Sequence, residues 1–187
     1  MSTQNKIGVV LMTYGSANTS ENVEAYFKHI YKNPSREVIE DFKQRYDVVG
    51  GSPLVRITKE QASLLEKRLG KYYVVRAGMR HSTPFIDEAI KESATEGATS
   101  LVGIILSPQF SSFIMDGYKK DFSAGAKKYG ITQTTVAAPW PTEEHFVELL
   151  AKRVSDKLSQ LGSVPVVCTT HSLPQRAVKK DPSYLSQ

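Results

Sequence analysis

The chain has 187 residues, of which 40% are hydrophobic and 23% charged, a composition typical of a soluble globular protein with one domain, or with one domain and part of another. Its formal net charge is +5, but the basic residues are scattered or paired, and they form no nucleic-acid-binding motif. The single cysteine, Cys168, excludes a disulfide framework, and the apolar run after the polar N-terminus is too short for a signal peptide or a membrane span. We therefore expect a cytoplasmic protein with no transmembrane segment and no nucleic-acid partner.

Apolar runs alternate with stretches of helical periodicity along the chain. We expect strands at 7–13, 72–77, 101–106 and 134–138, and a fifth strand in the stretch 164–174. Three helical segments are expected between the first two strands, and the third of them is predicted to begin at a capping box of Thr58 and Gln61. Thr142 is predicted to cap a long amphipathic helix before the fifth strand. This alternation predicts the α/β class, with a doubly wound, Rossmann-like parallel sheet.

Residues that can do chemistry follow each expected strand. They are Tyr14, His81, the segment 107–112, Trp140 and His171. The carboxyl ends of the strands in an open parallel sheet lie at the edge where ligands bind. These groups can therefore build one cleft.

His171 follows an apolar, β-branched run that is typical of a strand buried on both faces. A neutral imidazole at the end of such a strand can accept a proton near pH 7 or ligate a transition metal. A histidine at this position can equally serve only a backbone hydrogen bond. Position alone leaves both interpretations open.

Several common functional motifs are absent from the sequence. The segment after the first strand is neither a dinucleotide-binding glycine motif nor a phosphate-binding loop, and no nucleophile elbow occurs. No cysteine–histidine pair has the spacing of a structural zinc site. Phenol oxygen, imidazole and hydroxyl groups remain, with basic residues nearby: Arg45, Arg76, Arg80, Lys119 and Lys120. Oxygen and imidazole ligands suit divalent iron and its neighbours, and a histidine can also take a proton from a substrate.

Motifs in order along the whole chain carry a resemblance to a known family. They are Met12-Thr13-Tyr14-Gly15, Arg45-Tyr46, Gly50-Gly51-Ser52-Pro53-Leu54, Ile57-Thr58 with Gln61-Ala62, Gly78 with His81, Pro84-Phe85-Ile86, Ser107-Pro108-Gln109-Phe110-Ser111, Tyr118-Lys119, His171-Ser172-Leu173-Pro174, Asp181-Pro182 and Gln187. With these motifs the chain resembles the ferrochelatase family, which inserts ferrous iron into a porphyrin. The tyrosine of the first motif resembles the bacterial branch that uses coproporphyrin.

The resemblance implies two α/β domains with a porphyrin cleft between them. We expect the first domain at 1–162 and the start of a second, truncated domain at 163–187. His171 is implied to be the catalytic histidine, which accepts pyrrole protons and helps to hold the metal. Tyr14 is implied to lie on the opposite face of the porphyrin, with its oxygen able to approach the metal. No permanently bound cofactor is expected, because Fe²⁺ is a substrate.

The resemblance also implies residues that hold the propionates of the porphyrin. Arg45, Ser52 and Tyr118 match positions that grip these carboxylates through hydrogen bonds and charge. The chain has His29-Ile30-Tyr31-Lys32 where the bacterial branch has an arginine-rich segment, which leaves Lys32 as the candidate anchor there.

The chain ends at Gln187, before the family's catalytic glutamate and its returning C-terminal helix. We expect either a missing C-terminal half or self-association of the exposed edge. The main hypothesis is a ferrochelatase, or the N-terminal part of one, acting on coproporphyrin III. The alternatives are a non-catalytic porphyrin- or haem-binding homologue and a homodimeric chelatase with a site between two subunits.

Overall fold

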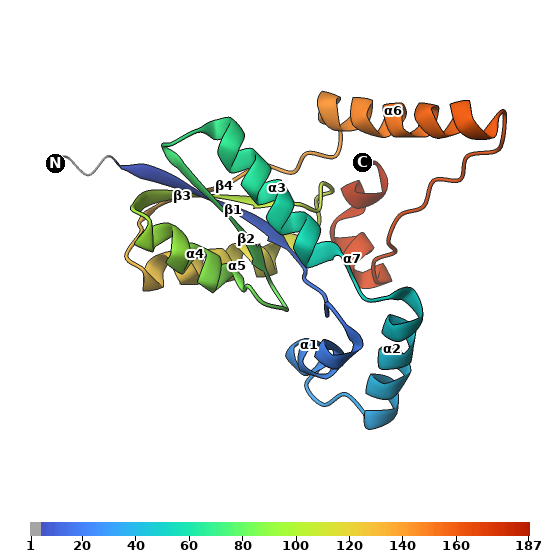
Figure 1. The fold of residues 1–187 in the computed structure, drawn as a ribbon, viewed down its shortest axis with the longest axis horizontal. Helices are drawn as coiled ribbons and strands as arrows, with labels where there is room; N and C mark the ends of the chain where they lie inside the picture. Colours follow the sequence, from blue (N-terminus) through green and yellow to red (C-terminus); the bar gives the residue numbers. More distant parts are fainter. Residues whose placement is uncertain (1–4) are drawn as a thin grey trace. The chain divides into compact units, whose positions relative to one another are not determined.

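The computed structural model describes residues 5–187. These residues form two compact units. Figure 1 shows the fold as a ribbon. The first unit runs to Leu106 and includes Gly117–Ala137. The second contains Ser107–Asp116 and Ala138–Gln187. The predicted domain boundary after residue 162 stays a prediction.

A parallel sheet forms the centre of the first unit. Its strands are β1 (Lys6–Thr13), β2 (Tyr73–Met79), β3 (Ala98–Ile105) and β4 (Gln133–Val136). Within the described residues the sheet has four strands in the order β2-β1-β3-β4, and all neighbours are parallel. Leu11 in β1 lies opposite Ala77 in β2 and Ile104 in β3. This topology confirms the predicted α/β, doubly wound fold.

Helices account for most of the remaining described chain. They are α1 (Val23–Ile30), α2 (Arg36–Val49), α3 (Leu54–Leu69), α4 (Ile86–Thr95), α5 (Ser112–Lys128), α6 (Glu144–Leu161) and α7 (Gln175–Lys180), with short 3₁₀ turns at Ser20–Asn22 and Pro182–Leu185. No helix among residues 5–187 is long and apolar enough to cross a membrane.

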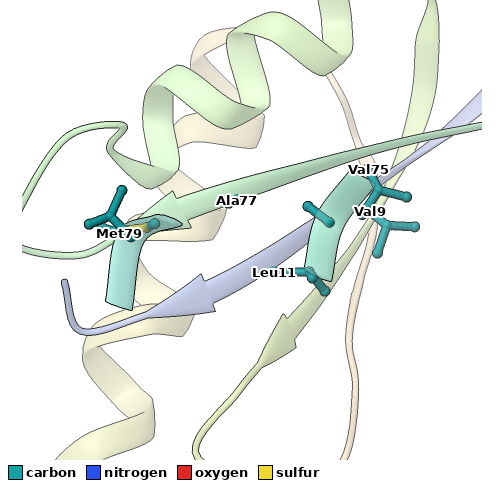
Figure 2. Close-up of a cluster of buried hydrophobic side chains, with 7 residues drawn as sticks. Val9, Leu11, Val75, Ala77 and Met79 are labelled. Carbon is teal, nitrogen blue, oxygen red and sulfur yellow. The ribbon is translucent and has the colours of Figure 1, made fainter. Parts of the chain in front are cut away.

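Helix α3 covers one face of the sheet. Successive residues of a strand point to opposite faces, so Val9 and Leu11 share a face in β1. They form a buried cluster with Val55 and Ala62 of α3 and with side chains of β2, namely Val75, Ala77 and Met79. Figure 2 shows these strand side chains together. This cluster is the hydrophobic core on the α3 side.

Helices α4 and α5 cover the other face. The backbone of Ile86 in α4 lies so close to Gly78 in β2 that a Cβ atom on Gly78 would be 2.8 Å from the Ile86 Cα atom. A Cβ atom on Gly103 of β3 would similarly be 3.2 Å from a ring atom of Phe122 in α5. Helices on both faces bury the sheet, as its continuous apolar strands require.

A smaller cluster joins α1 and α2. Val23 and Phe27 of α1 pack with Ile39 of α2 and with Ala17, which precedes α1. The ring centroids of Phe27 and Phe42 lie 4.5 Å apart. Helices α1 and α2 therefore have a small core of their own.

Both predicted helix caps are wrong. Helix α3 begins at Leu54, so Thr58 lies inside it, is buried, and donates its hydroxyl to the Leu54 carbonyl at 2.8 Å. Glu143 rather than Thr142 caps α6, because its carboxylate accepts from the Phe146 amide at 3.0 Å. A hydroxyl within a helix can bond to the carbonyl four residues earlier, and sequence spacing does not distinguish this arrangement from a cap.

The expected fifth strand is also absent from the described structure. Residues 163–174 contain no strand, and Val166 and Val167 are exposed. A strand needs a neighbouring strand to take up its backbone hydrogen bonds. The apolar, β-branched composition of this segment favours a strand, but within residues 5–187 no neighbouring strand pairs with it.

Candidate functional site

The loops that follow β1 and β2 are joined at the carboxyl edge of the sheet. The Arg80 amide donates to the Thr13 carbonyl at 2.9 Å, and the His81 amide donates to the Tyr14 carbonyl at the same distance. The side chain of Tyr14 is 43% exposed. An exposed phenol group thus lies at the sheet edge where a ligand is expected.

Two histidines lie next to Tyr14 in the first unit. The His81 ring centroid is 4.4 Å from that of Tyr14, and the His81 Nδ1 atom is 3.0 Å from Nδ1 of His29 on α1. The His29 ring stacks on Phe85 with 5.1 Å between centroids. His81 thus lies among aromatic rings, four residues before the N-cap of α4. Phe85 precedes that helix, and its amide donates to Glu88 at 2.6 Å.

These aromatic groups have shifted pKa values. Burial, with the nearby Arg80 and His29, lowers the pKa of His81 from 6.5 to about 4, so this ring is neutral at pH 7. Burial and the neighbouring Tyr31 raise the pKa of Tyr14 above 10.0, although Arg80 opposes the shift. Tyr14 is consequently a protonated phenol near neutral pH.

Arg80 connects the β2 loop to α5. Its Nε atom lies 3.1 Å from Asp121 Oδ2, and its guanidinium carbon lies 5.8 Å from the centroid of the Tyr118 ring. A Cβ atom on Gly117 would collide with this guanidinium, so the absence of a side chain there allows Arg80 to lie against α5. Tyr118 is buried, and burial raises the pKa of its hydroxyl, which therefore stays protonated at neutral pH.

Ser52 lies in the loop between α2 and α3 and reaches the loop after β1. Its hydroxyl oxygen accepts from Ser16 Oγ at 2.9 Å, and its amide donates to the Asn18 carbonyl at 3.1 Å. The preceding Gly51 has a φ of 85° and lies against the Asn18 carbonyl, so a side chain there would be both strained and obstructed. The loop therefore places the Ser52 hydroxyl near the backbone that follows Tyr14.

The other candidate anchors lie on or near the α1–α2 pair. Arg45 projects from α2, pairs with Asp41 at 2.7 Å, and lies 5.1 Å from the centroid of the Phe42 ring. Lys32 is exposed in the loop after α1, and Lys119 and Lys120 are exposed on α5. Arg76 differs, since it lies within β2 and pairs with Glu66, Glu92 and Glu96. It is thus part of an ion-pair network along the edge strand.

His171 is exposed in the irregular segment of the second unit. The Tyr184 hydroxyl donates to the His171 carbonyl at 3.0 Å. In the same unit, the amide of Phe110 donates to the side-chain oxygen of Gln187 at 2.7 Å, and Asp181 Oδ2 accepts from the Ser112 amide at 2.8 Å. The C-terminal residues therefore hold both the loop after β3 and the segment that carries His171.

The first unit brings together some of the predicted residues. Tyr14, Tyr118 and Ser52 lie around the carboxyl edge of the sheet through the contacts described above, whereas His171 and Trp140 belong to the second unit. Sequence reasoning did not assign a site role to His29 or Gly117. Both become evident only through partners far along the chain, His81 and Arg80. Within residues 5–187, no three histidine, cysteine or acidic side chains form a metal-binding group.

Comparison with known proteins identifies the class to which this fold and site belong. The sequence model of the ferrochelatase family matches residues 6–187. The chain therefore belongs to the ferrochelatase family, as its motifs suggested.

Its relatives include bacterial enzymes named coproporphyrin III ferrochelatase. The chain is 32% identical to the one from Halalkalibacterium halodurans, with 99% of this chain and 63% of the relative aligned. It is 33% identical to the one from Oceanobacillus iheyensis, over 97% of this chain and 62% of the relative. It is also 33% identical to the one from Bacillus subtilis, over 91% of this chain and 59% of the relative. The chain thus spans less than two thirds of the length of these relatives.

Proposed function

We propose that this protein takes part in haem synthesis by inserting ferrous iron into a porphyrin, with coproporphyrin III as the substrate. The observation that carries the proposal is the family match over residues 6–187, which includes an exposed Tyr14 at the carboxyl edge of the sheet. The names of the relatives support coproporphyrin III as the porphyrin. Iron is a substrate in this proposal and not a resident cofactor.

The chemistry requires a base and a group that approaches the metal. Two pyrrole protons must leave the porphyrin as the dication enters. His171 is the proposed base, since its imidazole is exposed and a histidine can take a proton from a substrate. Tyr14 is the proposed oxygen donor to the metal, and it approaches the metal as a neutral phenol because its pKa is raised.

The propionates would be held by residues of the first unit. Arg45 would exchange its intrahelical partner Asp41 for a propionate, at little cost, because an exposed ion pair contributes about 0–1 kcal/mol. Ser52 and Lys32 would add a hydroxyl and an ammonium group. Tyr118 would donate a hydrogen bond, since its raised pKa keeps the hydroxyl proton in place.

Anaerobic iron insertion tests the activity. Coproporphyrin III and Fe²⁺ are mixed with the 187-residue chain, alone and fused to the part of the Bacillus subtilis relative that lies outside the match. We expect insertion in at least the fusion, and we expect His171→Ala to reduce its rate by about 10²–10⁴, the usual range for a general base. His145→Ala, on exposed α6, serves as the control and should leave the rate unchanged.

Porphyrin binding separates the proposal from its alternative. Fluorescence titration of the chain should give tighter binding of coproporphyrin III than of its tetramethyl ester, because charge-assisted hydrogen bonds are about twice as strong as neutral ones. Equal affinities would remove the propionate assignment. Tight porphyrin binding without iron insertion, both by the chain alone and by the fusion, would instead identify a non-catalytic porphyrin-binding protein.

A further inference from the structure

The two histidines beside Tyr14 have the geometry of a metal-binding pair. Their Nδ1 atoms lie 3.0 Å apart, although the residues are 52 positions apart in the sequence. Imidazole nitrogens ligate zinc at about 2.0–2.1 Å, so two such ligands at a right angle are separated by about 2.8–3.0 Å. The observed separation therefore matches two adjacent ligands of one ion without a change in backbone position.

Each ring is held by contacts outside the pair. His29 stacks on Phe85 with an interplanar angle of 28°, and the His81 ring lies against Tyr14. The His81 backbone is tied to the Tyr14 carbonyl. The pair is thus built from α1 and the loop after β2 and is oriented before an ion arrives, which lowers the cost of binding.

The surroundings of His29 give an ion access to its ring and carry both acidic and basic groups. His29 lines a cavity of about 340 Å³ whose wall also contains Asp87 and Asp121. These carboxylates face two cations in the same wall, since Asp121 pairs with Arg80 at 3.1 Å and Asp87 pairs with Lys128 at 2.7 Å. Both cations in this wall are therefore paired with acidic partners, and a dication can reach the His29 ring through the cavity.

We propose that His29 and His81 together bind one divalent first-row transition-metal ion, with ferrous iron as the natural load, and hold it beside Tyr14 before insertion. In the metal-free protein one Nδ1–H donates to the other Nδ1 atom. When the ion binds, each ring carries its hydrogen on Nε2, so that each Nδ1 lone pair faces the metal. Water fills the remaining coordination positions. The role in iron delivery rests on the proposed function, whereas metal binding does not.

Cobalt titration in the absence of porphyrin tests the site itself. Co²⁺ is added to the metal-free 187-residue chain, and binding is followed by visible absorption and calorimetry. We expect a site occupied by one ion per chain, and we expect His29→Gln and His81→Gln each to weaken it by at least tenfold, because even loss of an outer partner costs 10–100-fold in metal affinity. His145→Gln and His171→Ala should leave this site unchanged.

Several results would overturn the inference. They are an absence of saturable Co²⁺ binding, equal affinity in the wild type and His29→Gln, and loss of the site only in His171→Ala. Circular dichroism checks folding, and if His81→Gln does not fold, His29→Gln decides, because that side chain is exposed on α1.

Iron insertion separates this inference from the proposed function. In the 187-residue chain or the fusion, whichever inserts iron, His29→Gln should raise the KM for Fe²⁺ while kcat stays near the wild-type value. Normal insertion without Co²⁺ binding at the pair would contradict the metal site alone. Co²⁺ binding at the pair without insertion in any format would contradict the proposed function alone.

Discussion

Asp181 shows how a single side chain ties two distant segments of the second unit. Its Oδ2 atom accepts hydrogen bonds from the amide and the hydroxyl of Ser112, at 2.8 and 2.7 Å, where α5 begins. The first amides of a helix have no partner within the helix, and negative charge is favourable there. These bonds to Ser112 lower the pKa of Asp181 below its ordinary 3.8.

This shift predicts a loss of stability in acid. Because the folded pKa of Asp181 is lower than the unfolded value of 3.8, its contribution is fully present above that pH and is lost as the pH falls through the folded pKa. In Asp181→Asn, the urea midpoint should be lower than in the wild type at pH 7, and the difference should shrink below pH 3.8. Asp156→Asn, an exposed paired carboxylate on α6, is the control. A constant difference across this range would contradict the assignment.

Tyr184 is expected to hold the segment that carries His171. Its hydroxyl donates to the His171 carbonyl at 3.0 Å, and a hydrogen bond of this kind contributes about 0.5–1.5 kcal/mol net. Tyr184→Phe should therefore accelerate hydrogen exchange of the amides in 169–173 by about two- to tenfold, as measured by mass spectrometry. Tyr129→Phe, which removes a hydroxyl bond to Asp87 in the first unit, should not change exchange in this segment. Unchanged exchange in Tyr184→Phe would show that the bond does not hold the loop.

At the residue scale, the sequence shows which side chains can do chemistry better than it shows which side chains contact each other. Tyr14 was predictable because it directly follows a nearly continuous apolar strand, and the structure places it exposed at the sheet edge. The contact between His29 and His81 was not predictable, since it depends on how α1 packs near the loop after β2. Tyr118 was predicted as a binding residue, but its deep burial depends on tertiary packing.

At the scale of elements, two glycines show opposite packing constraints. A Cβ atom on Gly78 of β2 would be 2.8 Å from the Cα atom of Ile86, which is backbone of α4 and cannot move without the helix. A Cβ atom on Gly117 of α5 would meet only the end of the Arg80 side chain, which is flexible. A side chain added at Gly78 is therefore expected to cost more stability than one added at Gly117.

Gly78→Ala is expected to destabilise the protein by about 1–3 kcal/mol, the usual cost of overpacking, because α4 must shift away from the sheet. Urea unfolding measures this difference. Gly117→Ala is the matched control. It gains about 1 kcal/mol of helix propensity and loses one partly exposed ion pair between Arg80 and Asp121, so its unfolding free energy should stay within about 1 kcal/mol of the wild type. Equal destabilisation by both substitutions would refute this account of the α4–sheet contact.

The sequence predicted the elements of the first unit well because buried parallel strands are nearly continuous apolar runs. The first strand was expected at 7–13 and is found at Lys6–Thr13, and the third was expected at 101–106 and is found at Ala98–Ile105. Helix starts were less predictable, since Thr58 has the sequence pattern of a cap but lies within α3. The run at 164–168 has strand composition, yet pairing with a neighbour decides whether a strand forms.

At the scale of the whole molecule, the order of helices and strands predicted the fold class. Which side chains are exposed depends instead on what packs against each helix. Helix α6 is amphipathic in sequence but has no buried residue in the structure. Val147, Leu150 and Val154 lie on one face of this helix by their spacing, and each is at least 40% exposed. Apolar side chains gathered on an exposed face are typical of an interaction surface.

We therefore predict that the 187-residue chain self-associates through the face of α6 that carries Val147, Leu150 and Val154. Burying apolar surface yields about 25 cal/mol per Å², which favours contact between copies. Sedimentation equilibrium at increasing concentration should show a rising mean mass, and the double substitution Leu150→Lys with Val154→Lys should return the chain toward the monomer mass of 20.8 kDa. Leu149→Lys is the matched control, because Leu149 is equally exposed but lies on the opposite face of the same helix, so association should persist. A monomeric wild-type chain at all concentrations, or equal dissociation by Leu149→Lys, would show that this face does not mediate self-association.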